Sequence, residues 1–151
     1  MDGEHQQQTG AGEANVGHQL ARGGHAVDAA IAANAVMGVV APMMNGIGGD
    51  LFAIVYDAAS DTVHGLNASG WSARAASIDA LRALGLTAMP QTGIHSVTVP
   101  GAVSGWTSLH ERFGRTTLEN LLAPAIAHAE NGFPVSEWTS RLYSSSTQAH
   151  V

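Results

Sequence analysis

In the first third of the chain, mainly apolar residues recur at the spacing of one helix face. Val27, Ile31, Asn34, Ala35 and Gly38 recur at that spacing, which predicts a buried helix that stops before Pro42. An earlier helix is expected over residues 11–22, because glycine at positions 23 and 24 can take the left-handed conformation that closes a helix. Residues 1–10 are polar and predict a flexible tail.

The middle of the chain has strand patterns. The apolar run LFAIVY at residues 51–56 predicts a buried strand. After the turn DAASD, the segment TVHGLNA at residues 62–68 is expected to pair back as a hairpin. Residues 78–84 suit a short helix and residues 85–95 a loop. The alternation in SVTVP, residues 96–100, predicts a further strand.

Two helices are expected in the C-terminal half. Pro100 would open the first, since its missing N–H is harmless there, and Gly114 would close it. Thr116 and Glu119 form a capping-box pattern for the second helix. The second helix has a wide apolar stripe, contains Pro124, which is expected to kink it, and should end at Gly132 and Pro134.

A glycine-rich turn, MMNGIGGD, separates the first buried helix from the apolar strand. A dinucleotide-binding fingerprint would need a third glycine where Leu51 stands, and it would follow a strand and precede a helix. Here the order of elements is reversed, and no lysine is available for a phosphate-binding loop. We therefore interpret the turn as a connection that lets the backbone bend or pass close to its neighbours.

Other short motifs point to ordinary structure. Ser104 lies one position too late for the nucleophile elbow G-x-S-x-G and falls inside a predicted helix. The eight histidines include no pair at the spacing of a helical zinc site, so no metal ligand is predicted. Asn67-Ala68-Ser69 is a formal glycosylation acceptor, which we interpret as a chance occurrence.

Composition excludes several classes of protein. The 151 residues suit one domain with a real core, at 45% hydrophobic and 12% charged residues. A net charge of -6 without a basic stripe disfavours nucleic acid and anionic membrane surfaces as partners. The absence of cysteine excludes disulfides and thiolate chemistry. The most apolar window, Ala26–Met44, contains Asp28 and Asn34 and is expected to be a core helix, with no membrane span. No signal peptide is visible, which favours the cytoplasm if the N-terminus is native.

Three blocks in order resemble the large-subunit start of the γ-glutamyltranspeptidase (γ-glutamyltransferase) family. The first, residues 20–57, matches R-G-G-N-A-V-D-A-A and P-x-x-S-G-I-G-G-G, with His25 at the asparagine and Asp50 at the last glycine. The second, residues 96–115, is similar to V-P-G-x-V-x-G-x-x-x-x-H-x-x-F-G. The third, residues 121–136, is similar to L-x-P-A-I-x-L-A-x-x-G-F-x-V. The resemblance covers about residues 17–140.

The resemblance implies an α+β fold, a partial αββα sandwich of the N-terminal nucleophile hydrolases. Such a precursor cuts itself, and the new N-terminal threonine of the small subunit attacks a γ-glutamyl amide with its own α-amine as base. Nothing in residues 1–151 matches that nucleophile, so no catalytic residue is predicted in this chain. No cofactor is implied. The expected partners are the remainder of the precursor and a small γ-glutamyl or acyl amide.

The resemblance also suggests where substrate binds. In glutathione-cleaving members a D-x-R-E-x-A-P segment follows the hairpin, and its arginine grips the substrate carboxylate. In this chain Asn67 stands at the aspartate and Ser69 at the arginine. Arg74, five residues further on, either reaches the substrate through a different loop or is an ordinary surface arginine. Related acylases have N-x-S-G here, and this chain looks closer to them. We therefore expect amide hydrolysis or acyl transfer, with glutathione disfavoured as donor.

Two hypotheses and a domain division follow. Residues 1–10 are expected to be a tail, residues 11–143 a partial γ-glutamyltranspeptidase-like domain, and residues 144–151 a truncated tail. In one hypothesis the chain belongs to a working acyltransferase or amidohydrolase. In the other it is a catalytically inactive truncated fragment that at most packs against a partner.

Overall fold

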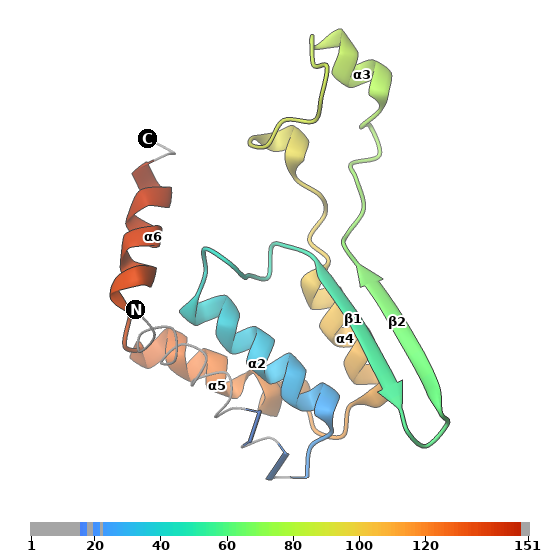
Figure 1. The fold of residues 1–151 in the computed structure, drawn as a ribbon, viewed down its shortest axis with the longest axis vertical. Helices are drawn as coiled ribbons and strands as arrows, with labels where there is room; N and C mark the ends of the chain where they lie inside the picture. The colour runs from blue at the N-terminus through green and yellow to red at the C-terminus, as the bar shows by residue number, and fades with distance from the viewer. Residues whose placement is uncertain (1–15, 18–19, 22, 149–151) are drawn as a thin grey trace. The chain divides into compact units, whose positions relative to one another are not determined.

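The computed structural model describes residues 16–17, 20–21 and 23–148 (Figure 1). The chain divides into two compact units, one made of residues 1–47 and 106–151 and the other of residues 48–105. Helices α2 (Ala26–Val40), α5 (Leu118–Asn131) and α6 (Glu137–Gln148) belong to the first unit. Strands β1 (Leu51–Asp57) and β2 (Thr62–Ala68), helix α3 (Ile78–Ala83) and the 3-10 turn η1 (Ile94–Ser96) belong to the second. The second boundary between the two units, between Gly105 and Trp106, falls within helix α4 (Ala102–Phe113).

Helix α2 begins with a reciprocal cap. The imidazole Nδ1 of His25 accepts the backbone N–H of Val27 at 3.3 Å, and the carboxylate of Asp28 accepts the backbone N–H of His25 at 2.7 Å. These two bonds satisfy donors that a helix start leaves open. The helix ends at Val40, two residues before Pro42, as the sequence predicts.

The core of the first unit forms where α2 packs against α5. Asp28 is fully buried and accepts the backbone N–H of Arg115, at 3.0 and 3.2 Å to its two carboxylate oxygens. The indole of Trp106 donates to the side-chain oxygen of Asn34 at 2.8 Å. Apolar residues fill the space between these polar anchors: Val27, Ala29, Ile31, Ala32, Ala35, Val36, Val40, Leu109, Leu121 and Ala125.

Helix α5 starts one residue later than the capping-box pattern indicates. Thr117, rather than Thr116, is the N-cap, and its hydroxyl accepts the backbone N–H of Asn120. The helix continues through Pro124 as one element and ends at Gly132, where φ is +78°. The predicted end is therefore confirmed, and the predicted cap residue is wrong by one position.

Strands β1 and β2 form the predicted antiparallel hairpin (Figure 1). Exposure alternates along β1, so Leu51, Ala53 and Val55 are partly covered while every second residue is open. The exposed fractions of Phe52, Ile54 and Tyr56 are 66%, 83% and 60%. The expectation of a buried strand is therefore wrong for one face of β1, because no described residue covers Phe52, Ile54 and Tyr56.

The predicted strand at residues 96–100 is also wrong. Ser96 ends the 3-10 turn, and residues 97–101 have no regular secondary structure. The backbone N–H of Val99 donates to the carbonyl of Trp71 at 2.9 Å, which is an isolated bond. Helix α4 then begins at Ala102, two residues after the proline that was expected to open it.

Helix α6 covers residues for which no element was predicted. The hydroxyl of Ser136 accepts the backbone N–H of Thr139 at 3.2 Å, and Arg141 pairs with Glu137 one turn away. The helix predicted over residues 11–22 lies mostly outside the described residues. The described part of that range, residues 16–17 and 20–21, is helical. No helix in the described ranges has the length and apolar character that a membrane crossing requires.

Candidate functional site

The candidate substrate residues Asn67 and Ser69 lie at the end of β2, where the chain turns. The side-chain oxygen of Asn67 accepts the backbone N–H of Ser69 at 3.0 Å, which closes an Asx turn. The carbonyl of Ser69 in turn accepts the hydroxyl of Thr98 at 3.3 Å. A segment almost thirty residues away in sequence therefore holds this turn in place.

Glycines bring the two segments into contact. Gly70 has φ +79°, and a Cβ on it would lie 1.8 Å from the carbonyl oxygen of Val99. A Cβ on Gly101 would lie 2.1 Å from the carbonyl oxygen of Ala68. Real atoms cannot approach so closely, so the contact needs glycine at both positions. The turn after β2 is thus fixed against the start of α4.

The glycine-rich turn before β1 joins the same cluster through Gly49. The carbonyl of Gly49 accepts the backbone N–H groups of both Gly101 and Ala102, each at 3.0 Å. These donors belong to the start of α4, which otherwise leaves its first N–H groups unsatisfied. Gly105 is also close, because a Cβ there would meet Leu51 at 2.9 Å and Ala68 at 3.0 Å.

The Ser69 side chain is available for a ligand. Ser69 is half-buried, and its hydroxyl makes no hydrogen bond within the described part of the chain. Asn67 is exposed and faces Phe52 across the hairpin. With its oxygen engaged in the turn, Asn67 still offers the two N–H donors of its amide. The turn therefore presents neutral hydrogen-bonding groups.

Arg74 stands apart from that turn. It is exposed, in a turn beyond β2, and its guanidinium has no hydrogen bond or ion pair to the residues that the structure describes. A pocket of about 260 Å³ lies in the same unit, between residues 72–84 and 89–98. Ala73 and Ala75 line it, whereas Arg74 does not. Nothing in the described contacts brings Arg74 to Ser69.

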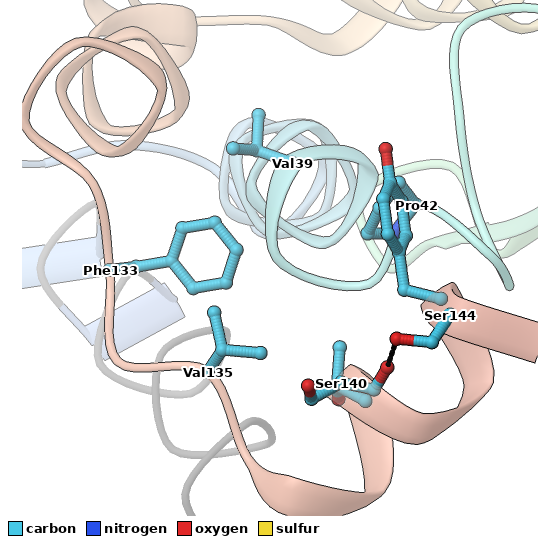
Figure 2. Close-up of a pocket in the computed structure, with 8 residues that line it drawn as sticks. Val39, Pro42, Phe133, Val135, Ser140 and Ser144 are labelled. Atoms are coloured by element: carbon cyan, nitrogen blue, oxygen red, sulfur yellow. Dashed lines mark hydrogen bonds between the residues drawn. The ribbon is translucent and has the colours of Figure 1, made fainter. Parts of the chain in front are cut away.

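A second pocket, of about 320 Å³, lies in the first unit (Figure 2). The end of α2, the segment after α5 and one side of α6 surround it. Its walls are mainly apolar, and the hydroxyl of Ser144 is already bonded to the carbonyl of Ser140 at 2.9 Å. The lining residues are Val39, Pro42, Phe133, Val135, Thr139, Ser140, Tyr143 and Ser144.

The histidines serve the fold where the structure describes their contacts. His25 caps α2, and the Nε2 of His110 is 2.5 Å from the carbonyl oxygen of Thr116. Across residues 23–148 no three histidine, aspartate or glutamate side chains gather in a way that could hold a metal ion.

Sequence reasoning missed the residues that position the turn, namely Thr98, Gly70 and the carbonyl of Gly49. Gly101 belongs to the V-P-G block and to the incomplete G-x-S-x-G pattern, but neither pattern predicted its close contact with Ala68. The Pro-Gly pair at residues 100–101 was the available signal, since this dipeptide indicates a turn rather than a strand.

Comparison with known proteins agrees with these observations. The family model described as gamma-glutamyltranspeptidase matches residues 14–150. The glutathione hydrolase-like YwrD proenzyme of Bacillus subtilis is 42% identical over 118 residues, covering 78% of this chain and 22% of that protein. The oxamate amidohydrolase proenzyme of Klebsiella pneumoniae is 37% identical over 123 residues, covering 78% and 23%. The chain thus spans about a fifth of the length of such relatives.

Solved structures of other proteins resemble this chain closely. Cephalosporin acylase from Bacillus halodurans superposes with a TM-score of 0.82 at 36% identity, covering 94% of this chain and 26% of the acylase. The γ-glutamyltranspeptidase of Helicobacter pylori superposes with a TM-score of 0.79 at 28% identity, covering 87% and 38%. The mixed helices and hairpin are therefore part of an N-terminal nucleophile hydrolase fold, as the sequence predicts. The chain belongs to the γ-glutamyltranspeptidase family.

Proposed function

We propose that these residues belong to an enzyme that transfers or hydrolyses the acyl group of a γ-glutamyl or related amide. The proposed nucleophile is the N-terminal threonine of a small subunit, outside residues 1–151. Its hydroxyl attacks the amide carbonyl while its α-amine takes the hydroxyl proton and passes it to the amide nitrogen, so that the C–N bond breaks and the substrate amine leaves. Water or a second amine then attacks the acyl-enzyme and releases threonine. Family membership and the amide-cleaving names of the relatives support this reaction class.

Within that enzyme, the proposed role of this chain is to bind the acyl donor at the turn after β2. The observation that carries the proposal is the unengaged Ser69 hydroxyl on a turn fixed by Asn67 and Gly101. A turn that cannot shift holds its donors in one geometry, which is what substrate positioning requires. Ser69 and the amide of Asn67 would each donate a hydrogen bond to the acyl donor.

The neutral turn sets the proposed preference among donors. An arginine offers a carboxylate two parallel charge-assisted hydrogen bonds, whereas this turn offers it single hydrogen bonds from neutral donors. A donor with a carboxylate at this position would therefore bind less tightly here than at an arginine. We propose that neutral acyl amides are preferred over glutathione. Arg74 is kept as a second proposed contact, used only if its loop moves toward the turn.

The first test uses the full-length gene product with γ-glutamyl-p-nitroanilide and a panel of acyl amides. Ser69→Arg should raise kcat/KM for the γ-glutamyl donor relative to neutral amides, and Ser69→Ala should lower kcat/KM for the neutral amides. Unchanged ratios in both variants would contradict a role for Ser69. Arg74→Ala is compared with Arg82→Ala, an exposed arginine on α3. Equal donor affinity in these two variants would remove Arg74 from the site.

The second test concerns the chain alone. The purified 151-residue chain should show no turnover of any substrate in the panel, because the proposed nucleophile is absent from it. Turnover above the blank would show that residues 1–151 hold a catalytic group after all. That outcome would contradict the location of the nucleophile without contradicting the proposed role of Ser69.

A second candidate function is structural, and the exposed face of the hairpin favours it. Phe52, Ile54, Tyr56 and Val63 present apolar surface on one side of β1 and β2. Such a face normally contacts another protein surface. In this reading the chain is inactive and serves as a packing partner for the remainder of the precursor. Ile54→Ser should then weaken co-purification with that remainder, while Thr62→Ser at the hairpin end should not.

A further inference from the structure

Two Asn-Gly pairs occur in the described chain, and their surroundings differ. Asn45-Gly46 lies in the turn between α2 and β1, and Asn131-Gly132 lies at the end of α5. Glycine after asparagine leaves the backbone nitrogen without a neighbouring side chain to shield it and lets the backbone bend freely. This combination permits the nitrogen to attack the asparagine side chain.

At Asn45 the structure brings the reacting groups together. The backbone N–H of Gly46 donates to the side-chain oxygen of Asn45 at 2.8 Å, so its nitrogen faces the amide that it would attack. The asparagine itself is held in the turn, because its backbone N–H donates to the carbonyl of Ala41 at 3.1 Å. The side-chain nitrogen has one long contact, 3.4 Å to the carbonyl of Asn34.

At Asn131 the corresponding groups are engaged elsewhere. The backbone N–H of Gly132 donates to the carbonyl of His128 at 3.0 Å, as the last bond of the helix. The side-chain nitrogen of Asn131 donates to the carbonyl of Ala127 at 2.9 Å. Attack by the Gly132 nitrogen would first require the helix end to open.

We propose that Asn45 is a site of spontaneous deamidation. The nitrogen of Gly46 forms a bond to Cγ of Asn45, the bond from Cγ to Nδ2 breaks, and Nδ2 leaves as ammonia with the proton from the attacking N–H. Water then opens the resulting succinimide at either carbonyl and leaves aspartate or isoaspartate. The step requires water alone, because neither oxidation nor reduction occurs.

Both products change the turn. An aspartate removes the donor to the Asn34 carbonyl and places a carboxylate beside it, so that two acceptors face each other. An isoaspartate inserts an extra carbon into the backbone before Gly46. The Cα of Gly46 is 3.7 Å from the position of a Cβ built on Gly38, so the lengthened backbone would lie beside α2.

The experiment follows both sites in one sample. The 151-residue chain is incubated in mildly alkaline buffer, digested and analysed by mass spectrometry with a fragmentation method that separates aspartate from isoaspartate. Opening the helical bond at Gly132 costs about one net hydrogen bond, so we expect Asn45 to react about tenfold faster than Asn131. In urea the helix end is lost and the two rates should become similar.

Two outcomes would overturn the proposal. One is a rate at Asn131 equal to or above the rate at Asn45 in the folded chain. The other is a ratio between the two sites that urea leaves unchanged, since the preference would then come from the local sequence alone.

A matched variant separates the chemistry from damage to the fold. Gly46→Ala introduces a methyl group with no atom within 4 Å, at a position outside the left-handed region. It should preserve the far-ultraviolet circular dichroism and slow the reaction at Asn45 while leaving Asn131 unchanged. Reaction at Asn45 that continues at the parent rate in this variant would also contradict attack by the following nitrogen.

Discussion

Asp28 offers the sharpest test of how the first unit is held together. Its carboxylate is fully buried and accepts backbone N–H groups from His25, at the start of α2, and from Arg115, between α4 and α5. A hydrogen bond to a charged group contributes about 1.5–3 kcal/mol, and a buried donor left without a partner carries a cost of similar size. Two such bonds predict a loss of about 3–5 kcal/mol for Asp28→Ala.

Two further variants separate the effects. Asp28→Asn keeps the shape and one acceptor but turns an amide toward the second N–H, so its loss should be smaller, at about 1–3 kcal/mol. Asp50→Asn removes an exposed carboxylate of the glycine-rich turn and should change stability by less than about 0.5 kcal/mol. The expected loss of stability therefore decreases from Asp28→Ala to Asp28→Asn to Asp50→Asn, following the burial of the side chain and the number of N–H groups that it accepts.

The assay follows urea unfolding through the fluorescence of Trp106, which is buried in the same unit. Trp71 and Trp138 are exposed and are replaced by phenylalanine in the parent chain. Midpoint and slope together give the change in the free energy of unfolding. Amide exchange at Arg115 should also become faster in Asp28→Ala. A loss below about 1 kcal/mol with unchanged exchange would refute the assignment of Asp28 as the link between these segments.

Three other perturbations test separate features. Gly101→Ala should destabilise the second unit by about 1–3 kcal/mol through overpacking, whereas Gly65→Ala, which meets no atom within 4 Å, should have a far smaller effect in the same thermal melt. Asn34→Ala leaves the buried indole N–H without its acceptor and should cost about 1–3 kcal/mol in urea unfolding, with no loss refuting that bond. The hydrogen bond from Tyr56 to Asp61 raises the pKa of Tyr56, so its contribution is present below the ordinary tyrosine pKa and is lost as pH rises through the raised value. Asp61→Gly, which suits the φ of 51° there, should lower that pKa in an absorbance titration, and an unchanged curve would contradict the bond.

Local patterns predicted the elements whose stabilising contacts lie close in sequence. The spacing of Val27, Ile31 and Ala35 correctly predicted the helical period of α2. The turn between the two strands is short, so a hairpin was the simplest way for them to pair. The capping-box pattern, by contrast, indicated Thr116, because Glu119 stands three residues after it. The helix begins after Thr117 instead, whose hydroxyl accepts the backbone N–H of Asn120.

Other features depend on distant residues and were not predictable in this way. The alternation at residues 96–100 resembles a strand, but Gly70 and Gly101 place this segment against a turn, where a single bond from Val99 replaces a ladder. At the candidate site, Asn67 and Ser69 are neighbours in sequence and share an Asx turn. The bond from Thr98 that fixes them joins positions 29 apart, and no local period reports such a contact.

The division of the first unit into two stretches has a consequence for the order of folding. Helix α2 is made early in synthesis, but α5, against which it packs, follows only after the whole of Gly48–Gly105. Joining the two stretches closes a loop of roughly sixty residues, with an entropic cost of about 3–4 kcal/mol if that loop is a free chain. A hairpin that has already formed shortens the effective loop and lowers this cost. We therefore expect the second unit to collapse first, and α2 to remain partly unpaired until α5 has been synthesised.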